Sequence, residues 1–95
     1  MVLGVGVALN ARGLTDYNAA FLQGKLEFYL YNPNSGGTIS NGPGWGSSIY
    51  QGCLSFGITG QRAIQIAVNA NDGSFKKRHG TPSGSTVYWA EWTDL

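Results

Sequence analysis

Apolar and polar side chains alternate along two segments of the chain with the period of a β-strand. In the first, residues 25–31, one face carries three large apolar side chains: Leu26, Phe28 and Leu30. In the second, residues 62–70, one face carries four: Ile64, Ile66, Val68 and Ala70. Successive side chains of a strand point to opposite faces, so each segment predicts a strand whose apolar face turns inward.

A third strand is predicted over residues 49–58. Its apolar face carries Tyr50, Leu54, Phe56 and Ile58, and Gly52 leaves a gap in that face. Cys53 falls on the opposite face, where we expect it to be a small buried hydrophobic residue. Two loops rich in Gly and Pro, residues 32–37 and 41–48, separate this strand from the first. They predict long connections rather than further elements.

The sequence Asn71-Asp72-Gly73 predicts a hairpin after the second alternating segment. If Asp72-Gly73 is a two-residue turn, Ala70 lies opposite Phe75, which stays on the apolar face. If all three residues form the turn, every side chain of the return strand changes face. The apolar side chain of Phe75 favours the first register.

The remaining segments complete a mainly β prediction. Residues 86–92 are expected to form the last strand, and residues 14–22 a short helical turn with Asp16 as its N-cap. We therefore predict a mainly β fold, a small antiparallel sheet or sandwich-like domain with long Gly-rich loops and at most one short helix. Residues 1–95 are taken as one domain, of which residues 1–24 are the least defined part.

Composition narrows the possible partners. Charged residues make up only 12 % of the chain, Gly occurs 15 times, and the formal net charge is +1. That charge provides no basic footprint for nucleic acid. The apolar residues 2–9 have no preceding Lys or Arg and are too short to span a membrane, so we expect neither a signal peptide nor membrane insertion.

No catalytic, metal or cofactor motif is recognised, and we expect a non-enzymatic protein with no cofactor. One cysteine, Cys53, excludes an intrachain disulfide, and with a single histidine it leaves too few ligands for a zinc site built on Cys and His. The pair Gly4-Val5-Gly6 lacks the rest of a dinucleotide fingerprint. No close pair suggests acid and base roles among the five carboxylates: Asp16, Glu27, Asp72, Glu91 and Asp94.

Two features are candidate ligand sites. Lys76, Lys77, Arg78 and His79 form a basic run, in which Lys76 and Arg78 share one strand face and Lys77 and His79 the other. The run is either a solvated edge that discourages strand pairing or a site for an anionic sugar or phosphate. Trp45 either caps the core, lies in a subunit interface or stacks on a sugar ring. The candidate ligand-binding residues are Trp45, Tyr50, Lys76, Arg78 and His79.

Two of the three tryptophans, Trp89 and Trp92, lie within the last seven residues of the sequence. In a continuous strand the two indoles point to opposite faces. We expect Trp89 to lie inside with Val87, and Trp92 to lie at a contact with a neighbouring subunit or a loop. Trp92 and Tyr88 are the candidate interface residues.

A set of short motifs in residues 49–95 resembles the knob domain of phage tail fibres and R-type pyocin fibres. The motifs are Leu54 with Gly57, Gln65-Ile66, Asn71-Asp72-Gly73-Ser74-Phe75 with Arg78, and Trp89-x-x-Trp92-x-x-Leu95. Upstream, either Leu9-Asn10 or residues 14–18 look like the family's opening segment, and Phe28-Tyr29 looks like its first aromatic strand. The spacing from that opening to Gly24 and Phe28 is longer than in the family.

The resemblance implies a homotrimeric, mostly β module of a fibre that contributes to adsorption onto a bacterial surface. Its partners would be copies of itself, other phage tail proteins, and an envelope glycan such as lipopolysaccharide. Its location would be the virion, after synthesis in the bacterial cytoplasm. Two alternatives remain: a structural virion part, spacer or attachment module, that contacts only other phage proteins, and a glycan-active enzyme, which would need two carboxylates in one cleft.

Overall fold

A computed structural model describes residues 11–95. The predictions made for the apolar residues 2–9, for Gly4-Val5-Gly6 and for Leu9-Asn10 lie outside the described residues. The elements, in chain order, are β1 (Arg12–Gly13), the 3₁₀ turn η1 (Tyr17–Ala19), β2 (Glu27–Tyr31), β3 (Gln51–Ile58), β4 (Arg62–Asn69), β5 (Phe75–Ser83), β6 (Thr86–Trp89) and β7 (Thr93–Asp94). No helix in this part of the chain is long and apolar enough to cross a membrane.

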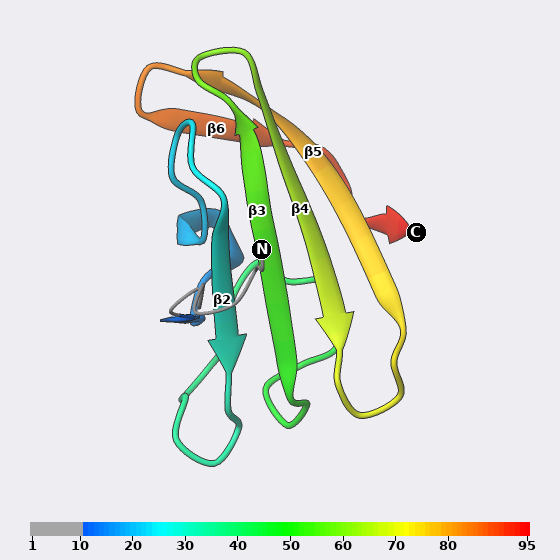
Figure 1. The fold of residues 1–95 in the computed structure, drawn as a ribbon. Helices are drawn as coiled ribbons and strands as arrows, with labels where there is room; N and C mark the ends of the chain where they lie inside the picture. The colour runs from blue at the N-terminus through cyan, green and yellow to red at the C-terminus, as the bar shows by residue number, and fades with distance from the viewer. Residues whose placement is uncertain (1–10) are drawn as a thin grey trace, which may run out of the picture.

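The strands form one curled sheet with the shape of a half-barrel (Figure 1). Its order is β1-β2-β3-β4-β5-β6. β6 pairs with the second half of β5, and β7 pairs with the first half. β1 runs parallel to β2, while the other neighbours are antiparallel. The mainly β prediction is confirmed, including its single short helical turn, in which Asp16 caps η1 by accepting from the Asn18 N–H at 2.9 Å.

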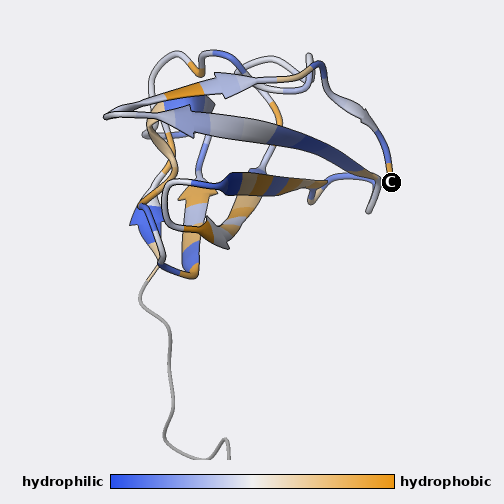
Figure 2. Ribbon diagram, turned by 90° about the horizontal axis from the view of Figure 1, so that it is seen from above, coloured by the Kyte–Doolittle hydropathy of each residue, from blue (hydrophilic) through white to orange (hydrophobic). Residues whose placement is uncertain are grey.

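The predicted inward face of the sheet is wrong. Seen from above, apolar and polar residues alternate along the central strands of the curled sheet (Figure 2). The apolar members of this alternation lie on the open side: Leu30 is 60 % exposed, and Leu26, Phe28, Phe56, Ile58 and Phe75 are also exposed. The covered side carries the other set of positions, including Gln65, which is 0 % exposed. We call these two sides the outer face and the covered face.

The covered face is the one against which the residues around η1 pack. Leu14, Tyr17 and Ala20 form the core with four residues of the sheet: Tyr29, Tyr31, Cys53 and Ala67. The small side chains of Cys53 and Ala67 leave room for the Tyr17 ring in the centre. Burial raises the pKa of the Cys53 thiol to about 11, and that of the Tyr17 phenol even further above its ordinary value. The prediction that Cys53 is a small buried residue is confirmed.

Polar side chains on the covered face supply the hydrogen bonds that η1 lacks. The Gln65 amide donates through Nε2 to the carbonyls of Tyr17 at 2.7 Å and Ala20 at 2.9 Å. The Tyr17 hydroxyl donates to Gln51 Oε1 at 2.8 Å. A short turn has carbonyl groups that can accept further hydrogen bonds. Packing it against a strand face that bears amides therefore costs less free energy than packing it against an apolar face. This explains why the covered face is the more polar one.

The β4–β5 hairpin keeps Phe75 on the apolar face as predicted, but its pairing is shifted by two residues. Val68 lies opposite Phe75, so the loop has four residues, Ala70 to Gly73. Asn69 Oδ1 accepts from the N–H of Asn71 at 2.9 Å, and the turn begins two residues earlier than expected. Gly73 provides the left-handed position with φ 79°.

The final strand does not continue from Thr86 to Trp92. β6 ends at Trp89, and residues 90–92 leave the sheet before β7 returns to β5. Because this break changes the phase of the alternation, Trp89 and Trp92 both come to the Arg78 side chain. The prediction that they point to opposite faces is therefore wrong.

Candidate functional site

The two terminal indoles enclose the side chain of Arg78. The Arg78 guanidinium carbon lies 4.3 Å from the centre of the Trp89 ring and 4.5 Å from that of Trp92. Arg78 Nε donates to Gln65 Oε1 at 2.7 Å and Nη2 donates to Asn18 Oδ1 at 2.9 Å. We call Arg78, its two indoles and these two amides the Arg78 cluster. Cation–π contact and charge-assisted hydrogen bonds both stabilise a desolvated guanidinium.

Arg78 remains a cation in this cluster. Arg78 is only 7 % exposed, and this burial lowers the pKa of its guanidinium to about 10. The group is therefore still protonated at neutral pH. Its two hydrogen-bond acceptors, the side chains of Gln65 and Asn18, are neutral amides, so neither of them neutralises the positive charge of Arg78.

Two shallow hollows flank the Asn41-Gly42 turn beside the Arg78 cluster. One, of about 280 Å³, is lined by Asn18, Asn41, Gly42, Arg78, Trp89, Ala90, Glu91 and Trp92. The other, of about 290 Å³, is lined by Ile39, Asn41, Gly42, Gly44, Trp45, Gly46 and Gln51. Asn41 itself has φ 57°, and its carbonyl accepts from Trp92 Nε1 at 3.1 Å while its amide donates to Asp16.

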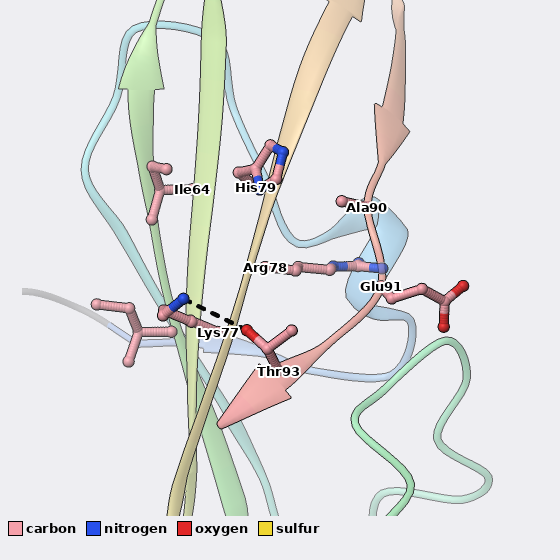
Figure 3. A pocket seen from close by; sticks show the side chains of 8 residues that line it. Ile64, Lys77, Arg78, His79, Ala90, Glu91 and Thr93 are labelled. Atoms are coloured by element: carbon pink, nitrogen blue, oxygen red, sulfur yellow. Dashed lines mark hydrogen bonds between the residues drawn. The ribbon is translucent and has the colours of Figure 1, made fainter. Parts of the chain in front are cut away.

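A larger hollow of about 510 Å³ lies where residues 90–92 leave the sheet (Figure 3). Its lining includes Ile64, Lys77, His79 and Thr93, and Lys77 Nζ donates to Thr93 Oγ1 at 3.3 Å. In Figure 3 the Arg78 side chain extends from β5 toward η1, and the Glu91 carboxylate points away from the other labelled groups. The basic run is therefore divided between the two sides of β5.

The outer face has a hollow of its own, above Gly52. It measures about 330 Å³ and is lined mainly by apolar residues: Phe28, Tyr29, Leu30, Gly52, Cys53, Leu54, Ile66, Val68 and Phe75. A Cβ atom at Gly52 would lie 3.0 Å from Leu30 Cδ2. The gap predicted at Gly52 is thus a depression in an open apolar surface.

The other predicted site residues are dispersed. Trp45 is half-buried against the core beside its hollow, and Tyr50 is exposed, with its hydroxyl accepting from Asn34 Nδ2 at 2.7 Å. Lys76 forms an ion pair with Asp94, whose pKa is lowered by that hydrogen bond.

Of the two candidate interface residues, Tyr88 is 67 % exposed, whereas Trp92 is half-buried against Tyr17, with ring centres 5.3 Å apart. Trp89, expected inside with Val87, is half-buried. β5 pairs on both sides, so the interpretation of the basic run as a strand edge is wrong.

Three residues of the Arg78 cluster were not predicted as site residues: Asn18, Gln65 and Trp89. A signal for Gln65 was present, because it shares a strand face with Ala63 and Ala67 and stands two positions before the latter. Small residues on one face of a strand leave space for a close-packed segment, and an amide among them can bond to that segment's backbone.

Four of the five carboxylates have separate partners in this structure. Asp16 accepts from Asn41, Glu27 pairs with Arg12, Asp94 pairs with Lys76, and Asp72 accepts from Ser74, which lowers its pKa. Within residues 11–95, no three His, Cys, Asp or Glu side chains gather as metal ligands. The non-enzymatic assignment stays a prediction.

In comparisons with family models, with curated proteins and with solved structures, the chain matches none of them.

Proposed function

We propose that this domain is a non-enzymatic assembly and binding module of a phage or prophage tail fibre. In this proposal it associates with copies of itself, as a trimer, through the outer face and presents the side around the Arg78 cluster to a bacterial envelope glycan. The observation that carries the assembly role is the uncovered outer face. The motifs that resemble fibre knob domains supply the fibre context and the trimer.

The outer face has the size of the apolar patches that are often functional on a protein surface. Four strands spaced ~4.8 Å apart and about eight residues long, at ~3.3 Å per residue, give an area of about 500 Å². The largest apolar patch on a typical monomer is about 300 to 600 Å² and is often functional. Exposed members of this face include Leu30 at 60 % and Ile58 at 66 %.

Covering this face with the sheets of neighbouring copies would explain the alternation of the sequence. In a trimer each outer face would turn toward the three-fold axis and meet those of both neighbours, with side chains interdigitated as they are between packed sheets, which lie ~10 Å apart. The hollow above Gly52 is a place for an apolar side chain of the neighbouring copy, and Lys77 and His79 lie along the rim of the same side. An amphipathic sheet with both faces buried needs no charged coat, which fits the 12 % of charged residues.

The test is sedimentation and light scattering of the 95-residue chain at ~100 µM, together with the variant Leu30→Lys. We expect the wild type to have about three times the 10.1 kDa mass of one chain and the variant to be a folded monomer. Gln61→Lys adds the same charge at an exposed turn and should leave the oligomer intact.

A monomeric wild type would overturn the assembly proposal, and an oligomer unaffected by Leu30→Lys would remove the outer face as its interface. A dimer sensitive to Leu30→Lys would keep the interface and overturn the trimer. The alternative of a part that contacts only other virion proteins predicts that the chain binds no glycan.

A further inference from the structure

We propose that the exposed edge of the Arg78 cluster is a binding site for an anionic group, a carboxylate or a phosphate, on a sugar. This names a ligand class for the recognition part of the proposed function. It does not depend on assembly through the outer face, which lies on the other side of the sheet.

Arg78 has more hydrogen-bond donors than its protein partners use. A guanidinium carries five N–H groups, and only those toward Gln65 and Asn18 are bonded here. In the described part of the chain the ion pairs are Arg12 with Glu27 and Lys76 with Asp94, and neither includes Arg78. A carboxylate is the usual partner of a buried arginine, and this one has two neutral amides instead.

The guanidinium lies over the rings of both Trp89 and Trp92, and its remaining N–H groups point outward in the plane of the group, as the N–H groups of every guanidinium do. In-plane donors are those that bind a carboxylate or phosphate with two parallel hydrogen bonds. The hollow of about 280 Å³ includes Arg78 and both indoles in its lining, together with the amides of Asn18 and Asn41.

Other polar groups surround this hollow. The Asn18 amide accepts from Arg78 through its oxygen, which leaves its NH₂ group as a donor. Trp89 Nε1 is buried and has no hydrogen-bond partner in residues 11–95. Asp16 contributes negative charge, but its Oδ1 is held by the Asn18 N–H and the Asn41 amide rather than by the guanidinium. Beside Arg78 the hollow therefore offers the Asn18 NH₂ group as a donor, and the Glu91 carboxylate in its lining is the group that would repel an anion.

If Arg78 only held η1, β4 and the C-terminal segment together, a carboxylate at position 18 would stabilise the guanidinium more than the amide of Asn18 does. Asn18→Asp supplies that carboxylate within reach of Nη2. We expect this variant to keep the fold, with a raised melting temperature, while its carboxylate occupies the donors that the ligand needs.

The experiment titrates the 95-residue chain with sodium phosphate, with D-galacturonate and with neutral D-galactose, at one ionic strength set with sodium chloride. Intrinsic fluorescence of the indoles beside Arg78 and the melting temperature are recorded. We expect a saturable change with phosphate, galacturonate or both, and none with galactose. The arm that responds shows whether the anion is a phosphate or a carboxylate.

The variants decide whether the response belongs to Arg78. Asn18→Asp should weaken binding at least tenfold, and Glu91→Gln, which removes a negative charge from the rim, should tighten it several-fold. Gln61→Glu adds the same charge as Asn18→Asp at a distant turn and should bind as the wild type does.

The absence of a saturable response to both anions, or equal affinity in Asn18→Asp and wild type, would overturn the proposal. Repeating the titration on Leu30→Lys separates this result from assembly: binding by that variant supports the Arg78 site whatever the oligomeric state. A loss of binding in Leu30→Lys alone would instead place the site on the outer face and overturn the proposal.

Discussion

Replacing Gln65 by Met should remove the central connection between the sheet and η1. Gln65 is 0 % exposed, donates to the carbonyls of Tyr17 and Ala20, and accepts from Arg78. Methionine has a similar length and no amide, so the change keeps the volume and deletes these three hydrogen bonds together with a longer one, of 3.3 Å, to Ser55 Oγ. The Arg78 Nε–H would then lose its acceptor, and the two carbonyls would keep only the Ala20 N–H and the Ser55 hydroxyl as donors.

The expected cost follows from these three bonds. A neutral buried hydrogen bond contributes about 1 kcal/mol and one to a charged group about 2, so Gln65→Met should lower the free energy of unfolding by about 4 kcal/mol. Domains of this size are stable by about 5 to 15 kcal/mol, so the variant should still fold. With a urea slope of about 2 kcal/mol/M, the unfolding midpoint should fall by about 2 M.

The assay is urea unfolding followed by tryptophan fluorescence, because Trp89 and Trp92 report directly on the Arg78 cluster. Gln61→Met is the matched control, since Gln61 is an exposed glutamine in the β3–β4 turn. A urea midpoint of Gln65→Met within about 0.3 M of the wild-type midpoint would contradict this expectation. It would mean that the hydrogen bonds of the Gln65 amide do not stabilise the packing of η1.

Two further predictions concern Cys53 and Gly57. The folded pKa of Cys53, about 11, lies above the ~8.5 of an unfolded thiol, so the folded state keeps its proton to higher pH and loses stability as pH rises between these values. Wild type should therefore lose about 2 kcal/mol more than Cys53→Ala between pH 7.5 and pH 10.5 in urea titrations, and equal losses would contradict the burial argument. At Gly57 a Cβ atom would lie 2.1 Å from the Arg62 carbonyl oxygen, so Gly57→Ala should cost about 3 kcal/mol by thermal unfolding. Gly13→Ala, which meets nothing within 4 Å, should melt within about 2 °C of wild type; equal shifts would disprove the clash.

The positions of the strands were predictable, whereas the covered face was not. Alternation at Gln65 and Ile66 shows that the two faces of β4 differ, and it defines the strand. It does not say which face another segment covers. The amide of Gln65 is buried because η1 presents carbonyls to it, and that pairing joins residues 45 and 48 positions apart in the sequence.

The Arg78 cluster was predictable only in part. Arg78 and Trp92 were recognised as candidate site residues, but for separate reasons, since a continuous strand places Trp89 and Trp92 on opposite sides. The break after Trp89 brings them together, and the sequence Ala90-Glu91 contains no Gly or Pro to mark it. The contact with Asn18 spans 60 positions and depends on the placement of η1.

The hydrogen-bonding side chains of the covered face also select one alignment of the strands. An apolar core tolerates several arrangements of similar side chains, because dispersion contacts have little directionality. A one-residue slip of β4 would place Ile64 or Ile66 under η1, where the Tyr17 and Ala20 carbonyls need a donor. Misaligned sheets are thus penalised within the chain itself, so the apolar side chains of the outer face can vary without making the fold ambiguous.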